Sequence, residues 1–72
     1  MNRRFEAAAE RTRTSLLAIQ TKTLNEEHKE TLSRIRAFLA QAEQARSQDL
    51  LSAVSLAERA DLLSRDLLDR LR

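Results

Sequence analysis

The stretch ARSQDL, residues 45–50, decides the fold of this 72-residue chain. Alanine- and leucine-rich sequence lies on both sides of it, with apolar residues recurring every three or four positions, as on one face of a helix. A continuous helix, the rival interpretation, would carry the polar residues RSQD across that apolar face. We therefore predict that the chain reverses at residues 46–49 and does not form one unbroken helix in a coiled coil.

The sequence on either side of the reversal predicts two helices of matched length, at about 25–46 and about 49–71. Asp49, or alternatively Ser47, can cap the second helix by accepting a bond from a backbone N–H of its first turn. Arg46 suits the end of the first helix, where the dipole favours positive charge. At 1.5 Å per residue each helix is roughly 33–35 Å long, so a short link between them describes an antiparallel αα-hairpin.

Composition agrees with an all-α fold. The chain contains no glycine and no proline, whereas the tight turns of β-sheets usually need one of them or asparagine. It also contains no cysteine, which excludes disulfides and thiol chemistry. Large apolar residues other than leucine are few, so a chain this short would bury a thin core. We therefore expect it to dock onto a partner or onto copies of itself.

Residues 1–24 form a basic segment, in which we predict a third helix within 2–22. The segment carries five basic and two acidic side chains, whereas residues 25–72 carry eight basic and nine acidic ones. This helix could pack into the groove of the hairpin and complete a three-helix bundle, or extend as an arm that grips a neighbour. Its junction with the hairpin lies near Asn25 or Thr23, either of which can cap the next helix.

The second helix of the hairpin carries leucines outside its main apolar face. A helix with apolar residues on more than one face usually contacts more than one neighbour. Two interpretations stay open: the N-terminal helix covers these leucines, or they form a subunit interface. The predicted interface combines leucines of this helix with apolar residues of the N-terminal segment: Leu51, Leu56, Leu62, Leu68, Phe5, Leu16 and Ile19.

Basic side chains of the N-terminal segment are the candidate nucleic-acid site. They are Arg3, Arg4, Arg11 and Arg13. Arg4 and Arg11 share one helix face and could meet phosphates. However, the chain has no tyrosine or tryptophan for base stacking, and its net charge is only +2. Binding to nucleic acid or to an anionic surface is therefore kept as an alternative to protein association.

No pattern of residues indicates catalysis, a metal or a cofactor. The single histidine, His28, has no metal-ligating side chain at a helical spacing. The pairs Asp61–Arg65 and Asp66–Arg70 have the spacing of ion pairs on a helix surface. We predict a non-enzymatic protein without cofactor, metal or small-molecule substrate.

The run IRAFLAQAEQARSQDLLSAVSLAERADLLSRDLL, residues 35–68, resembles the helix pairs of tetratricopeptide-type repeats. In those repeats small residues let two helices approach closely and an acidic residue, here Asp49, opens the second helix. The helices of this chain are longer, and the aromatic and proline positions of the repeat are missing. The small residues of the seam would be Ala42, Ala45, Ala53, Ala57 and Ala60.

Residues 23–68 are also similar to a group of small uncharacterised bacterial proteins. That resemblance implies a helical hairpin, often in cell-envelope proteins, and no activity. A hairpin fragment of such a protein is therefore a further alternative for the whole chain.

Taken together, these observations predict a protein–protein association module, either self-assembling or a small structural subunit of a larger complex. No run of about 20 apolar residues and no signal peptide is found. We expect a soluble chain whose compartment the sequence leaves open.

Overall fold

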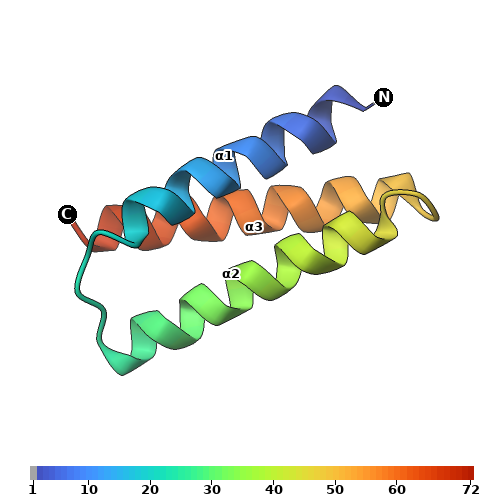
Figure 1. Ribbon diagram of the computed structural model, residues 1–72. Helices are drawn as coiled ribbons and strands as arrows, with labels where there is room; N and C mark the ends of the chain where they lie inside the picture. Colours follow the sequence, from blue (N-terminus) through green and yellow to red (C-terminus); the bar gives the residue numbers. More distant parts are fainter. Residues whose placement is uncertain (1) are drawn as a thin grey trace.

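Three helices make up the regular structure of residues 2–72, the part of the chain that the computed structural model describes (Figure 1). They are α1 (Arg3–Ile19), α2 (Glu26–Ala45) and α3 (Leu50–Arg70). The predicted all-α fold, a long antiparallel hairpin preceded by an N-terminal helix, is confirmed. The predicted bounds of the two hairpin helices differ from the observed ones by one residue at each end.

The chain reverses at the predicted place through a capped turn. The backbone N–H groups of Gln48 and Asp49 donate to the carbonyl oxygen of Ala45, at 3.0 and 2.7 Å. The Asp49 carboxylate caps α3 by accepting from the N–H of Ser52 at 3.2 Å and from its hydroxyl at 2.8 Å. The hydroxyl bond, supported by the backbone bond, lowers the pKa of Asp49 from its ordinary value. No residue of 2–72 has a positive φ, so the turn closes without glycine.

Asparagine residues cap the other two helices. The Asn25 side-chain oxygen accepts from the N–H of His28 at 2.8 Å. Of the two candidate caps, Asn25 and not Thr23 therefore begins α2. Asn2 caps α1 in the same way and accepts from two backbone N–H groups of its first turn.

Helix α3 lies in the middle of the bundle and packs along both other helices (Figure 1). The contact between α1 and α2 is much smaller. In Figure 1, α1 runs parallel to α3, and α2 runs antiparallel to both. The N-terminal helix thus packs on its own hairpin, which selects the three-helix bundle over the extended arm.

The core follows α3 and is built largely of small residues. Six of its thirteen buried apolar residues are alanines, so the helices approach closely but the core has little volume. Four of the five alanines predicted for the seam are fully buried, and Ala45 is partly buried against them. Of the large apolar side chains that are completely buried, Phe5 and Ile19 lie at the two ends of α1, Ile35 lies in the middle of α2 and Leu67 lies near the end of α3.

Candidate functional site

Among residues 2–72, every ion pair that joins two helices involves α1. The pairs are Arg4–Glu58 and Arg11–Asp61 with α3, and Arg13–Glu43 and Glu6–Arg46 with α2. The ion pairs of the hairpin itself lie within single helices in this part of the chain. The charge asymmetry of the sequence therefore has a structural role, because the basic N-terminal helix docks on carboxylates of the hairpin.

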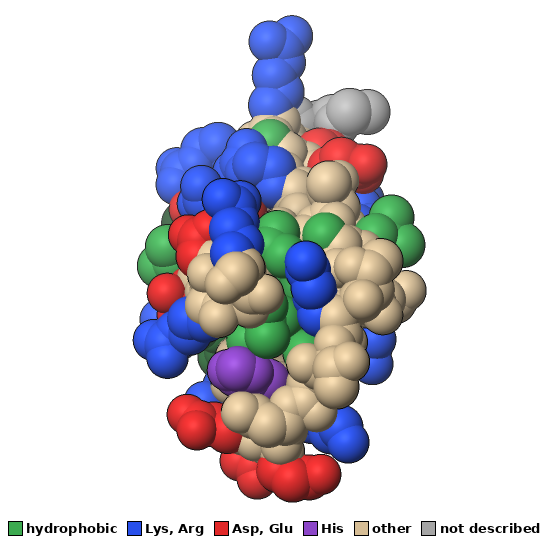
Figure 2. Space-filling view, turned by 90° about the vertical axis from the view of Figure 1, so that its left-hand side faces the viewer, with side chains coloured by type: hydrophobic (Ala, Val, Ile, Leu, Met, Phe, Trp, Pro, Cys, Tyr) green, Lys and Arg blue, Asp and Glu red, His purple; other side chains and the backbone are tan. Residues whose placement is uncertain are grey.

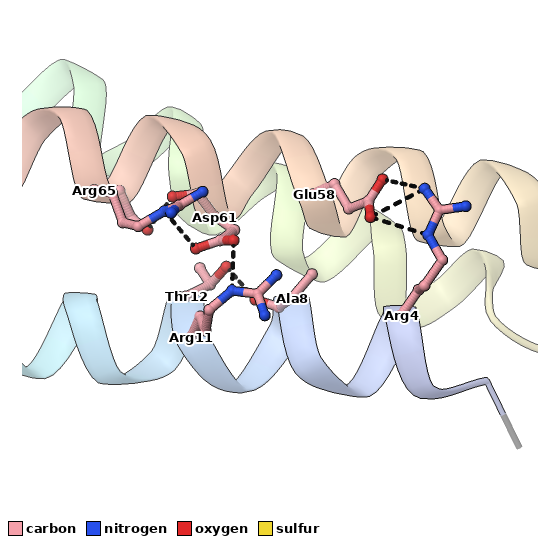
Figure 3. A network of polar contacts seen from close by, with 8 residues as sticks. Arg4, Ala8, Arg11, Thr12, Glu58, Asp61 and Arg65 are labelled. Carbon is pink, nitrogen blue, oxygen red and sulfur yellow. Dashed lines mark hydrogen bonds and ion pairs between the residues drawn. The ribbon is translucent and has the colours of Figure 1, made fainter.

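Arg4 and Glu58 form a two-pronged contact across the α1–α3 face (Figure 3). Arg4 Nη2 donates to Glu58 Oε1 at 2.8 Å, and Arg4 Nε donates to Oε2 at 3.2 Å. Both side chains are well exposed to solvent, so the pair contributes less than about 1 kcal/mol to stability. Its fixed geometry instead sets the register of α1 along α3.

Asp61 is a buried carboxylate at the centre of the same face, with a side chain only 3% exposed. Arg11 Nε donates to its Oδ2 at 2.8 Å. Arg65 Nε lies 3.2 Å from Oδ1, close enough for an ion pair but without the alignment of a hydrogen bond (Figure 3). The carboxylate is therefore enclosed between one arginine of α1 and one of its own helix.

The burial of Asp61 corrects the sequence analysis. The Asp61–Arg65 pair is present as predicted, but it was expected on the surface of the helix, and α1 covers its carboxylate. A signal for this was available, because Asp61 follows Val54 by one heptad and Ala57 by four residues. Both of those residues lie on the buried stripe of α3.

The hydroxyl groups beside Asp61 are used within their own helices. Thr12 donates to the carbonyl of Ala8 at 2.7 Å, and Ser64 donates to the carbonyl of Asp61 at 2.8 Å. Both residues are completely buried. The network in Figure 3 therefore suits the docking of one helix on another, since both of its carboxylates are paired with arginines and its hydroxyls are bonded.

The predicted interface residues fall into three groups. Leu51 and Leu62 are exposed on the outer face of α3, by 84% and 63%. Leu56 and Leu68 are half-buried against the core. The remaining three lie inside the bundle, where α1 meets the hairpin: Phe5, Leu16 and Ile19.

Two other leucines are exposed, and the sequence did not mark either of them as a candidate interface residue. Leu17 on α1 is 65% exposed, and Leu50 at the beginning of α3 is 42% exposed. Leu17 lies on the opposite side of its helix from the buried stripe, and Glu10 and Thr14 precede it on that side. It is therefore an isolated apolar residue in polar surroundings.

A hollow of about 320 Å³ lies beside Leu51, between the beginning of α1 and the first turns of α3. Its lining residues are Asn2, Arg4, Leu51, Val54, Ser55 and Glu58. Leu51, Ser55, Glu58 and Leu62 recur at spacings of four and three, so they form one stripe along α3, which we call the outer stripe. The hollow and the exposed Leu62 therefore belong to the same face of the molecule.

Ion pairs also engage most of the candidate nucleic-acid residues. Arg4, Arg11 and Arg13 each contact a carboxylate of another helix, whereas Arg3 has no ion pair within residues 2–72. Figure 2 looks at the end of the bundle where α1 leads into α2, and acidic side chains gather there at the bottom, around the beginning of α2. Because the ion pairs already occupy Arg4, Arg11 and Arg13, they weigh against a phosphate-binding surface on α1.

His28 lies at a second hollow, of about 190 Å³, between the beginning of α2 and the end of α3. Its charged lining is balanced: Glu27 and Asp66 are opposed by Arg34 and Arg70. Asp66 and Arg70 form the predicted ion pair at 3.2 Å. Residues 2–72 gather no group of three His, Cys, Asp or Glu side chains that could hold a metal ion.

No helix in the described part of the chain has the length and apolar character needed to cross a membrane. No family model, curated protein or solved structure matches the chain.

Proposed function

We propose that this protein is a non-enzymatic association module that pairs through the outer stripe of α3. The observation that carries the proposal is the exposure of Leu51 and Leu62 on one helix face. Burying a leucine side chain yields about 1.5–3 kcal/mol, which these two residues do not gain within one chain. A partner that covers the stripe would recover it.

The composition of the core supports the same proposal. A core in which six of thirteen residues are alanine supplies little apolar area, so a 72-residue bundle of this kind has little stability to spare. Association stabilises the folded state by mass action, because the partner binds the native chain and not the unfolded one. The outer stripe is the surface on which such stabilisation would act.

The packing of α1 leaves α3, and not α1, as the helix with an apolar surface free for a partner. Phe5, Leu16 and Ile19 are used inside the chain, so the N-terminal helix has few large apolar residues left for a partner. Leu17 is the exception, and it is isolated among polar side chains. On α3, by contrast, two leucines and a hollow share one stripe.

The molar mass in solution tests this function. We expect the wild-type chain to exceed its monomer mass of 8.3 kDa in sedimentation equilibrium, increasingly so with concentration. Leu62→Glu should return it to the monomer, because a charge on the stripe opposes burial. Leu17→Glu is the matched control, since Leu17 and Leu62 are 65% and 63% exposed.

Both variants should keep the helical circular dichroism of the wild type, because the replaced side chains lie outside the core. A wild-type mass of 8.3 kDa up to about 1 mM would reject self-association. An equal loss of association in Leu17→Glu would reject the choice of face.

A further inference from the structure

We infer that the outer stripe pairs with a second copy of itself in an antiparallel arrangement, each copy placing Leu62 in the hollow beside Leu51 of the other. This inference rests on the proposed function and adds the partner's orientation and contact residues. Three features support it: the register of the stripe, the pairing of its charges and the small residue between its leucines.

The register of the stripe suits a twofold axis. The hollow is centred near Ser55, and Leu62 lies seven residues further along the same face, about 11 Å at 1.5 Å per residue. Two identical faces are self-complementary when each offers a projection and a matching hollow on opposite sides of the axis. An axis passing beside Glu58 would place each Leu62 over the hollow of the other copy.

A parallel pair would not use this shape. It would set Leu62 against Leu62 and Leu51 against Leu51, and both hollows would stay empty. A hollow left to water gives up the gain from burying Leu62 there. The antiparallel arrangement instead brings an exposed leucine against Leu51 and the nearly buried Val54.

The charged groups of this face are paired within each copy. Arg4 is bound to Glu58, Arg11 and Arg65 contact the buried Asp61 beneath them, and Asp69 is paired with Arg72. At the axis two Glu58 carboxylates would approach each other, but each is already bound by both donor nitrogens of its own Arg4. The Glu58 carboxylate of one copy can then lie beside the Arg4 guanidinium of the other, so unlike charges meet at the axis.

The small side chain of Ser55 lets the α3 helices of the two copies approach closely. It is exposed and lies between Leu51 and Leu62 on the stripe. The distance between packed helices depends on the side chains at the contact, and a small one permits the closer end of the usual 8–10 Å range. A larger residue at this position would occupy the hollow that Leu62 of the second copy needs.

The size of the face limits the strength of pairing. A typical stable interface removes about 800 Å² from each partner, roughly a sixth of the 4975 Å² surface of this chain. One helix stripe with the adjoining edge of α1 offers less than that. We therefore expect weak pairing that depends strongly on protein concentration.

Filling the hollow tests the arrangement directly. Ser55→Leu should raise the dissociation constant at least tenfold, because its side chain would occupy the space for Leu62. In any arrangement that leaves the hollow unused, the same substitution adds apolar surface to the stripe and should tighten association. Ser33→Leu, at an exposed serine on α2, is the matched control and should leave pairing unchanged.

Cross-linking gives a second, independent readout, because the chain contains no cysteine. In the antiparallel pair, Ser55→Cys and Leu62→Cys should form a mixed disulfide when the two variants are combined and oxidised. Each variant alone should cross-link poorly, since its two copies would be displaced by about 10 Å along the helix, beyond disulfide reach. A parallel pair would cross-link each variant with itself.

The outcomes separate this inference from the function on which it rests. Tighter pairing of Ser55→Leu, or self-cross-linking of the single variants, would overturn the antiparallel arrangement and leave the proposed association intact. A wild-type chain that stays monomeric would overturn both. Loss of pairing in Ser55→Leu together with cross-linking only in the mixture would support the arrangement.

Discussion

The two sides of α3 are held to the rest of the molecule by different forces. On the α2 side, within residues 2–72, the contacts are apolar side chains and one stacking of Arg59 over the ring of Phe38 at 5.7 Å. On the α1 side, two arginine–carboxylate pairs cross the seam and one of the carboxylates is buried. Apolar side chains pack on both sides of the central helix, but only the α1 side adds ion pairs that cross the seam.

Because of this difference, we expect the two seams of the bundle to respond differently to salt. The hairpin seam depends on burial, which changes little with salt or pH. The docking of α1 combines the burial of apolar side chains with ion pairs, and the ion pairs lose strength as salt screens them. Helix α1 should therefore be the first element to open, while α2 and α3 stay paired.

The largest effect should come from shortening one isoleucine on each seam. Ile35 on α2 and Ile19 on α1 are both 0% exposed, so Ile35→Ala and Ile19→Ala remove the same atoms from equally buried sites. Each should lower the free energy of unfolding by about 2–4 kcal/mol in urea denaturation, through lost burial and the cavity left behind.

The two isoleucine variants should differ in where the bundle opens. In hydrogen exchange, Ile19→Ala should expose the amides of α1 while α2 and α3 stay protected, because Ile19 lies at the end of α1. Ile35→Ala should instead weaken the hairpin and with it the whole molecule. Equal loss of protection in all three helices of Ile19→Ala would show that the two seams form one cooperative unit.

The next effect should come from removing the buried charge. Asp61→Asn keeps the shape of the side chain but leaves Arg11 and Arg65 without their partner, so we expect a loss of about 1–3 kcal/mol. Asp66→Asn breaks a pair with the same spacing and the same 3.2 Å distance at an exposed site, and it should cost less than about 0.5 kcal/mol. Comparable losses in the two variants would mean that burial of Asp61 does not strengthen its contacts.

The features of the hairpin could be predicted from the sequence, whereas those that depend on the docking of α1 could be predicted less well. The reversal at residues 46–49 and the two hairpin helices are local features, and the sequence alone predicts them. It narrows the caps to Asn25 or Thr23 and to Asp49 or Ser47, and the structure selects Asn25 and Asp49. The spacing of Asp61 and Arg65 is typical of an exposed helix face and led to the wrong prediction for Asp61. The position of Asp61 on the stripe of Val54 and Ala57 indicated burial instead. The docking of α1 is what separates the buried Asp61 from the exposed Asp66.

The association site shows a similar limit. The distance of Leu51 and Leu62 from the main apolar stripe left open whether α1 covers them, and the structure leaves both on the surface. Leu56 and Leu68 were expected there too, but they are half-covered, since coverage depends on how the neighbouring helices approach α3. The hollow beside Leu51 needs Asn2 and Arg4 from α1, so it has no signature in the sequence of α3.

A smaller effect should come from salt. Raising the salt concentration to about 1 M shortens the screening length to about 3 Å, which weakens the exposed Arg4–Glu58 and Arg13–Glu43 pairs. We expect amide exchange in α1 to rise a few-fold relative to exchange in α2 and α3, measured at one pH. An unchanged ratio would show that apolar contacts alone hold α1 in place.

The smallest effect should come from the cap of α3, where the Asp49 carboxylate contacts only the first turn of its own helix. Because the pKa of Asp49 is lowered in the folded state by its bonds from Ser52, the unfolded chain binds a proton more readily. The contribution of the cap is therefore fully present above the unfolded pKa of about 4, and it is lost as pH falls through the folded value. Ser52→Ala removes the hydroxyl donor, so the pKa of Asp49 should rise toward its ordinary value in an NMR titration.

Since this cap contacts only its own helix, the Ser52→Ala change should leave the protection of α1 amides at neutral pH untouched. Asp61→Asn should act in the opposite way: it should expose α1 and leave the Asp49 titration unchanged. If Ser52→Ala also loosened α1, the electrostatics of the turn and of the α1 seam would be coupled through α3, and the two sides of that helix could not be treated as separate.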